Sequence, residues 1–419
     1  MSVKVHKKAQ RINVRNQRVT DMAGPEWDRE SRLSMIQMLI PLGLKAVEEE
    51  LQAEVRQWVG DRYTRGNGSC KRWGQNPGSV YLGDQKVRIN VPRVRNLNSQ
   101  EEVRLHSYDR LQDPSHLDDI ALSRVINGIS QGKYERAAEH VPETFGIKKS
   151  SISKKFIRAS GKLLQEFLTR DLSIHDIVAV FIDGKCFAEN EMVIALGVSI
   201  TGEKIVLGFI ETSTENHKVC RDFLNGLKER GLNLDQEMLF IIDGGKGIYK
   251  GIRDVMGDNA LIARCQWHKR ENVVEYLAKE RRAEYRRKLQ AAYNQTSYEL
   301  AKKAMDKIRN ELKLINQSAV NSLDEGLEET LTLHRLGMVE KLGRSFKTTN
   351  CIENVNKQLE VYTGRVSRWQ NSDQRQRWVA TALIEIEPRL RLVMGCKYLK
   401  ELRKAMKHII SNQKEEKAA

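Results

Sequence analysis

Two aspartates in this 419-residue chain each follow an apolar run directly. Asp183 comes after Ile177–Ile182, and Asp243 comes after Leu239–Ile242. Such runs are typical of buried strands, which would place both carboxylates where strands meet loops. Carboxylate oxygens are the ligands that Mg²⁺ prefers. The pattern therefore indicates one shared metal site, although an Asp before Gly is also an ordinary turn residue.

A third acidic residue, Glu353, is expected in the first turn of a helix capped by Thr349 or Asn350. Cleavage of a phosphodiester with magnesium needs oxygen ligands that hold two cations about 3.5–4 Å apart. Three carboxylates from two strands and a helix would meet this need. The triplet alone is weak evidence, because 55 acidic residues supply many triplets and Glu353 would also complement a helix dipole.

Four further residues could take part in the same chemistry. Cys265 and His268 form a C-x-x-H pair, but two ligands without a second pair rarely make a structural zinc site. We interpret His268 as a residue that approaches a scissile phosphate or hydrogen-bonds a ligand carboxylate, with Cys265 packed at a strand end. Lys185 and Lys246 are candidates for phosphate contacts. The GGKG sequence at 244–247 lacks the spacing of a nucleotide-binding loop, so ATP use is not predicted.

The elements that would position these residues follow an α/β pattern from residue 177 to 268. Three strands joined by tight turns, then strand and helix alternating, is the order of a mixed five-stranded sheet of the ribonuclease H type. Glycine and proline are absent from 258 to 325, so a long helical segment is expected after the last strand. The predicted strands are Ile177–Ile182, Met192–Ile200, Lys204–Glu211, Met238–Ile242 and Ala260–Cys265, and the helices lie at about His217–Arg230, Ile248–Met256 and Trp378–Ile386.

The N-terminal part is basic and is expected to be mainly helical. Residues 1–28 read as a polar arm, and Ser31–Gly60 as two helices divided at Pro41 and Gly43. The segment 61–98 ends in an alternating strand pattern, Val87–Arg95. Its cations could clamp a phosphate backbone while Tyr63 and Trp73 stack on bases, or they could belong to a solvated basic hairpin. These cations are Arg62, Arg65, Lys71, Arg72, Arg93 and Arg95.

A helix-turn-helix unit is predicted between residues 118 and 172. Tyr134–His140 and Ser150–Ser160 read as helices separated by a break at Pro142 to Gly146. The second helix is expected to present cations to solvent and DNA: Lys154, Lys155 and Arg158. Helical pairs of this length also occur in ordinary bundles.

Composition limits the class of protein. The 71 Lys and Arg residues against 55 Asp and Glu give a net charge of +16, which favours a polyanionic partner. Six scattered cysteines without CxxC pairing fit reduced intracellular thiols. No secretory signal or membrane span is predicted, so we expect a cytoplasmic, nucleoid-associated protein.

Four motifs resemble the mutator family of prokaryotic insertion-sequence transposases in order and spacing. They are FIDGK at Phe181–Lys185, IIDGGKG at Ile241–Gly247, RCQWHKREN at Arg264–Asn272 and TTNCIENVN at Thr348–Asn356. VPRVRN at 91–96 and RWVATALIEIE at 377–387 extend the resemblance over most of the chain. It departs from the family pattern at Cys351 and at the Gln266-Trp267 pair, neither of which is a predicted metal ligand.

The resemblance implies a DDE transposase with a ribonuclease H-like catalytic domain interrupted by an all-α insertion. Asp183, Asp243 and Glu353 would then be the catalytic triad, holding two Mg²⁺ ions or Mn²⁺ in their place. The implied partner is double-stranded DNA, both terminal inverted repeats and target, bound by a homodimer or larger homo-oligomer. A transposase-derived regulator that no longer cuts, or a nuclease acting on RNA or DNA structure, are the alternatives.

The same reasoning predicts how the chain is divided. The expected parts are a basic DNA-binding and dimerisation region (1–117), a helix-turn-helix-like domain (118–172), the first part of the catalytic domain (173–275), the helical insertion (276–344), the second catalytic part with the Glu-bearing helix (345–385) and a C-terminal helical tail (386–419).

Overall fold

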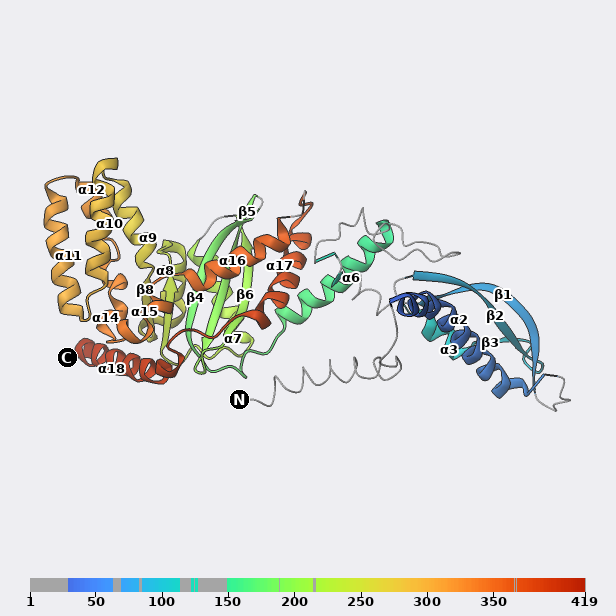
Figure 1. Ribbon diagram of the computed structural model, residues 1–419. Helices are drawn as coiled ribbons and strands as arrows, with labels where there is room; N and C mark the ends of the chain where they lie inside the picture. The colour runs from blue at the N-terminus through green and yellow to red at the C-terminus, as the bar shows by residue number, and fades with distance from the viewer. Residues whose placement is uncertain are drawn as a thin grey trace. The chain divides into compact units, whose positions relative to one another are not determined.

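A computed structural model describes residues 29–62, 69–82, 85–113, 122–123, 125–126, 149–187, 189–213, 216–364, 366 and 368–418. The chain divides into two compact units (Figure 1), the first comprising 1–125 and 129–156 and the second 126–128 and 157–419. Among the described residues, no helix is both long and apolar enough to cross a membrane. The finer boundaries expected from the sequence stay predictions.

The first unit packs one long helix on a β-hairpin. The unit contains α2 (Arg29–Val59), β1 (Cys70–Leu82), β2 (Gln85–Asn96), β3 (Glu102–Val103) and α3 (His106–Leu111). Strand β2 pairs antiparallel with both β1 and β3, so the strand predicted at 87–95 is confirmed. Its alternate residues Val87, Ile89 and Val91 are buried, because one face of the hairpin packs against α2. Strands therefore make up much of a region predicted to be mainly helical.

The predicted division at Pro41 and Gly43 is wrong, because α2 continues through both. A proline inside a helix removes one backbone hydrogen bond. Burial of Val47, Leu51 and Val55 against the hairpin offsets that cost by stabilising the helix as a whole.

The predicted helix-turn-helix lies mostly outside the described residues. Its first helix and its turn, at 134–146, are not described, and its second helix falls within α6 (Lys149–Leu168). Lys154 and Arg158 are exposed there as expected. The expected exposure of Lys155 is wrong, since its side chain is buried with the ammonium 5.2 Å from the centre of the Tyr81 ring.

The second unit is built on a five-stranded mixed sheet. Its strand order is β6-β5-β4-β7-β8, with antiparallel pairing among the first three and parallel pairing of β4 with β7 and of β7 with β8. All five predicted strands are confirmed. They are β4 (Ile177–Phe187), β5 (Asn190–Ser199), β6 (Lys204–Thr212), β7 (Met238–Ile242) and β8 (Ala260–Arg264).

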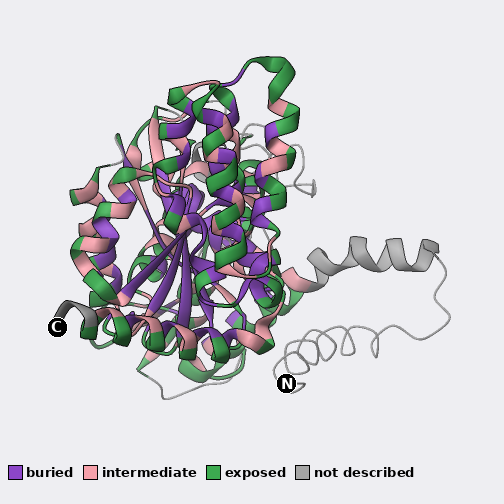
Figure 2. Ribbon diagram, turned by 90° about the vertical axis from the view of Figure 1, so that its left-hand side faces the viewer, coloured by how far each residue is buried: buried purple, intermediate pink, exposed green. Residues whose placement is uncertain are grey.

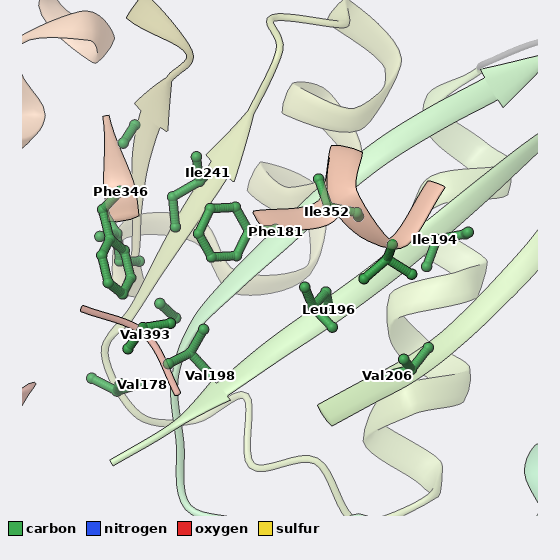
Figure 3. Packing of buried hydrophobic residues seen from close by; sticks show 14 of the residues in the cluster. Val178, Phe181, Ile194, Leu196, Val198, Val206, Ile241, Phe346, Ile352 and Val393 are labelled. Carbon is green, nitrogen blue, oxygen red and sulfur yellow. The ribbon is translucent and has the colours of Figure 1, made fainter. Parts of the chain in front are cut away.

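Helices cover both faces of this sheet, so most residues of its strands are buried (Figure 2). On one face, α7 (His217–Glu229) and α8 (Lys246–Met256) contribute Leu224, Leu227 and Ile252 to a core with the strands. On the other, Phe181, Leu196 and Ile241 meet side chains that come from much later in the chain (Figure 3). Those later elements are α15 (Val339–Phe346), α16 (Asn350–Thr363), α17 (Ser372–Ile386), η2 (Glu387–Arg389), η3 (Cys396–Tyr398) and α18 (Leu399–Ala418).

The stretch without glycine or proline is helical, but it forms several helices with a core of their own. Side chains such as Tyr285, Met305 and Leu323 are buried in that core. Two of the breaks occur at polar N-caps, since Ser297 accepts a hydrogen bond from Leu300 N and Asn316 from Ala319 N. The helices of this stretch are α9 (Gln266–Glu275), α10 (Lys279–Tyr293), α11 (Tyr298–Lys313) and α12 (Gln317–Asp324). After Gly326 follow α13 (Leu327–Thr330) and α14 (Thr332–Arg335), and η1 (Gly257–Asn259) precedes β8.

Candidate active site

Asp183 and Asp243 occupy equivalent positions on neighbouring strands. Ile182 of β4 lies opposite Ile242 of β7 in the parallel register, and each aspartate is the next residue. Strand β4 does not end at Asp183 as predicted, because its residues up to Phe187 continue to pair with β5. The parallel pairing of β4 with β7 does end there, so the two carboxylates lie side by side at the end of the β4-β7 pairing. Asp243 is also a turn residue, since its Oδ1 accepts a hydrogen bond from Gly245 N at 3.0 Å.

Helix α16 brings Glu353 to the same end of the β4-β7 pairing. Ile352 and Val355 anchor the helix in the sheet core, and Glu353 is in its first turn, as the sequence predicts. Thr349 is the N-cap residue, but its hydroxyl does not bond a backbone amide. It donates instead to Glu353 Oε1 at 2.7 Å, and it lies 3.5 Å from Cys265 Sγ and 3.4 Å from His268 Nδ1. One buried hydroxyl thus joins Glu353 to the C-x-x-H pair.

The electrostatics show that these groups act on one another. Burial, followed by the charges of Asp243 and Glu353, raises the pKa of Asp183 to about 7, against opposing effects of His268 and Asn356. The neighbouring Cys265 side chain, with smaller contributions from Glu353 and Asp243, raises the pKa of His268 to about 9. His268 therefore carries a positive charge among the carboxylates at neutral pH.

Cys265 is fully buried at the end of β8, as predicted. Burial raises the pKa of its thiol, but hydrogen bonds from His268 and Thr349 outweigh burial and bring the pKa below its ordinary value. This arrangement holds the His268 ring in place through Cys265 and Thr349. A direct hydrogen bond from His268 to a carboxylate is not made among the described residues.

Asn356 is a site residue that the sequence did not single out. Its Nδ2 donates to Asp183 Oδ2 at 2.9 Å, while its Oδ1 is buried without a hydrogen-bond partner in the described part of the chain. The available signal was spacing, because Asn356 lies three residues after Glu353 and therefore on the same face of α16.

The two lysines predicted to contact phosphate differ in their surroundings. Lys185 Nζ bonds the Asn356 carbonyl at 3.1 Å and the Glu360 carboxylate at 2.9 Å, which ties β4 to α16. Lys246 has a side chain 90% exposed, at 3.7 Å from a Glu325 oxygen. Lys185 is thus committed to the fold, and Lys246 is the one of the pair that is open to a ligand.

Comparison with known proteins decides the family. The sequence model of a family described as "Transposase, Mutator family" matches residues 22–389. The chain belongs to this family. It is 25% identical over 355 residues to the transposase for insertion sequence element IS256 in transposon Tn4001 of Staphylococcus aureus, a match that covers 81% of this chain and 85% of the relative.

Other relatives of the mutator-family protein come from different bacteria. The transposase for insertion sequence element IS905 of Lactococcus lactis subsp. lactis is 25% identical over 358 residues, with 80% of this chain and 85% of the relative covered. The transposase for element ISRM5 of Rhizobium meliloti is 22% identical over 364 residues, covering 82% and 88%. Membership in this family supports a role in transposition.

The chemistry of the mutator-family site fits a hard divalent cation. The charges of Asp243 and Glu353 help to raise the pKa of the buried Asp183 carboxyl, and Asn356 Oδ1 adds an acceptor without a donor among the described residues. Within the described residues, however, no group of three or more His, Cys, Asp and Glu side chains could hold a metal ion as it stands. The donor set therefore fits, and its side chains would have to converge further around an ion.

The basic residues predicted to clamp DNA in the first unit are divided between internal and free roles. Arg93 forms a two-pronged ion pair with Glu102, and Arg72 bonds Gln52 and the Gly60 carbonyl. Arg95 bonds the Gln100 carbonyl and lies 4.7 Å from the Trp73 ring centre. Lys71 and Arg62 are exposed, while Arg65 lies outside the described residues. A part of this set thus stabilises the hairpin.

Proposed function

We propose that this protein is a DDE transposase that cuts DNA at the ends of its element and joins those ends to target DNA. The supporting observation is the convergence of Asp183, Asp243 and Glu353 from two strands and a distant helix, in a chain of the mutator family. The strand order β6-β5-β4-β7-β8, with its parallel and antiparallel pairs, further supports a ribonuclease H-like catalytic domain.

In this proposal, Asp183, Asp243 and Glu353 hold Mg²⁺, and bound Mg²⁺ would supply nucleophile activation and charge stabilisation. Asn356 orients the Asp183 carboxylate, leaving one of its oxygens free for a ligand. Thr349 fixes the Glu353 carboxylate and positions the His268 ring. Protonated His268 is placed to neutralise charge on a phosphate that approaches the carboxylates.

The partner in this proposal is duplex DNA bearing the element's terminal repeats, and two ends would require two or more copies of the chain. The net charge of +16 favours association with the DNA backbone. Lys71, Lys154 and Lys246 have exposed side chains and would contribute to this association.

A cleavage assay with the purified protein tests this function. The substrate is a duplex containing the native element end, incubated with Mg²⁺ and a target plasmid, and compared with a shuffled end. We expect Mg²⁺-dependent nicking at the native end, a free 3′-hydroxyl, and joined products. Specific binding without cleavage would instead support a regulator, and cleavage without joining would support a nuclease.

A further inference from the structure

A cavity of about 230 Å³ lies beside Asp243 and outside the group of three carboxylates. Gly244, which follows Asp243 directly, forms part of its wall, so a ligand there would be next to the proposed cleavage site. The apolar and aromatic part of its lining is formed by Ile242, Ile262 and Tyr249. The rest of the lining is Gly244, Lys246, Arg264, Glu325, Gly326 and Glu329.

Arg264 is the most firmly held polar residue of this wall. Its side chain is 11% exposed, and one Nη donates to the Glu325 carbonyl at 3.2 Å. A Cβ added to Gly244 or Gly326 would collide with the guanidinium, so the group lies between two glycine backbones. Both glycines have positive φ, at 115° and 72°, a conformation that favours glycine.

The Nε atom of Arg264 is buried and has no hydrogen-bond partner among the described residues. An unsatisfied buried donor costs free energy, but this atom is enclosed beside Gly244, so a ligand in the cavity would meet other atoms of the Arg264 side chain. Arg264 belongs to the RCQWHKREN motif, yet the proposed chemistry at the three carboxylates does not use it. It is therefore available for a separate binding role.

The mixed lining discriminates between classes of ligand. The carboxylates of Glu325 and Glu329 offset the charges of Lys246 and Arg264, so the lining has no net positive charge to attract a phosphate. A planar, neutral group could instead lie against the apolar part of the lining. A nucleobase has such faces, and its edge offers acceptors to Arg264 and N–H donors to Glu329. The volume is below the range of roughly 300–1,000 Å³ for sites of drug-sized ligands, which suits one base better than a larger group.

We propose that this cavity receives one extrahelical nucleobase of the DNA end. The inference rests on the proposed function, because the DNA must lie across the carboxylates for a neighbouring base to reach the cavity. Proteins that extrude a base hold it by stacking and by hydrogen bonds to its edge. Capture of one base here would fix the position of the DNA end relative to Asp243.

A double-mutant cycle between the DNA and the protein tests this proposal. The probes are duplexes of the native element end, each with a single abasic site near the cleavage position, and affinity is measured without divalent cations. With wild-type protein, we expect one position at which loss of the base weakens binding by roughly tenfold. With Arg264→Gln, loss of the same base should cause no additional weakening.

The matched control is Arg253→Gln. Arg253 also lies near Tyr249, at 5.6 Å from the ring centre, but bonds the Gly257 and Ala260 carbonyls and does not line the cavity. This variant should keep the wild-type dependence on the base. Glu329→Gln is a second test at a partly exposed position, in case Arg264→Gln does not fold, and it should reduce the same dependence.

The proposal would be overturned if, in both cavity variants, removing the base and changing the side chain weaken DNA binding additively. It would also be overturned if no abasic position weakens binding by the wild-type protein. If the protein still prefers the native end over a shuffled duplex and cuts it, only the cavity assignment fails. If the wild-type protein does not prefer the native end over a shuffled duplex, the proposed function itself is contradicted.

Discussion

Asp183 holds a buried negative charge close to two others. Without a cation, the burial of this charge and its repulsion by the other two both oppose folding, so Asp183→Asn should raise the free energy of unfolding at pH 8 in EDTA by about 1–3 kcal/mol. Urea denaturation checks this change. The control is Asp254→Asn, at an exposed position on α8, which should change the free energy of unfolding little. Equal stability of Asp183→Asn and wild type would argue against an unfavourable buried carboxylate at this position.

Thr349 connects the closing glutamate to the C-x-x-H pair through one hydroxyl. Thr349→Val keeps the shape but removes that hydroxyl, so the cleavage rate should fall by about 10–100-fold with little change in DNA affinity. Thr349→Ser restores a hydroxyl and should recover most of the rate. A Ser variant as slow as the Val variant would show that packing, and not the hydroxyl, is what matters.

At the scale of elements, Lys269 joins α9 to the end of α12. Its buried ammonium donates to the Ser322 carbonyl at 2.6 Å and to the Glu325 carbonyl. Burial, then the nearby Arg264 charge, lowers the pKa of Lys269 to about 8. The protonated form is thus disfavoured in the folded state, and between pH 8 and the ordinary value of 10.5 the unfolded chain binds more protons.

The contribution of Lys269 to the free energy of unfolding should therefore rise with pH across this interval. Lys269→Met should be more destabilising at pH 9.5 than at pH 7.5, by on the order of 1–3 kcal/mol. Urea unfolding at the two pH values measures this difference. The control is Lys250→Met, at an exposed position on α8, which should change the free energy of unfolding equally at the two pH values. If the effect of Lys269→Met does not depend on pH, the proposed role of the lowered pKa is contradicted.

The sequence predicts the strands and helices of the second unit better than it predicts the contacts between them. Apolar runs such as Ile177–Ile182 locate the strands, and the order of strands and helices indicates the sheet. The pairing of Lys185 with Glu360 and of Asn356 with Asp183 depends on how α16 crosses the sheet. Periodicity within one element does not contain that information, and Pro41 shows that tertiary packing can override a local breaker.

For the whole molecule, the charge of +16 should make DNA binding depend steeply on salt. Lys71 and Lys154 are exposed, so Lys71→Ala and Lys154→Ala should each reduce the slope of log K against log salt concentration by about one. Arg93→Gln, which breaks an internal ion pair, should leave the slope nearly unchanged. Fluorescence anisotropy across a salt series measures all three.

A larger effect from Arg93 than from either lysine would reverse this assignment. It would mean that the Arg93–Glu102 pair opens on DNA and that Arg93 itself contacts the phosphate backbone. All three variants must first show unchanged secondary structure by circular dichroism, so that a changed slope does not reflect a change in folding.

The central claim is that Asp183, Asp243 and Glu353 form one catalytic metal site. The most direct test is cleavage of native element-end DNA with Mg²⁺ by Asp183→Asn, Asp243→Asn and Glu353→Gln, beside Asp254→Asn as the matched surface control. We predict that each of the three loses cleavage by at least about 10³-fold while still binding the end, and that the control cuts normally. Full activity in any of the three would contradict the claim.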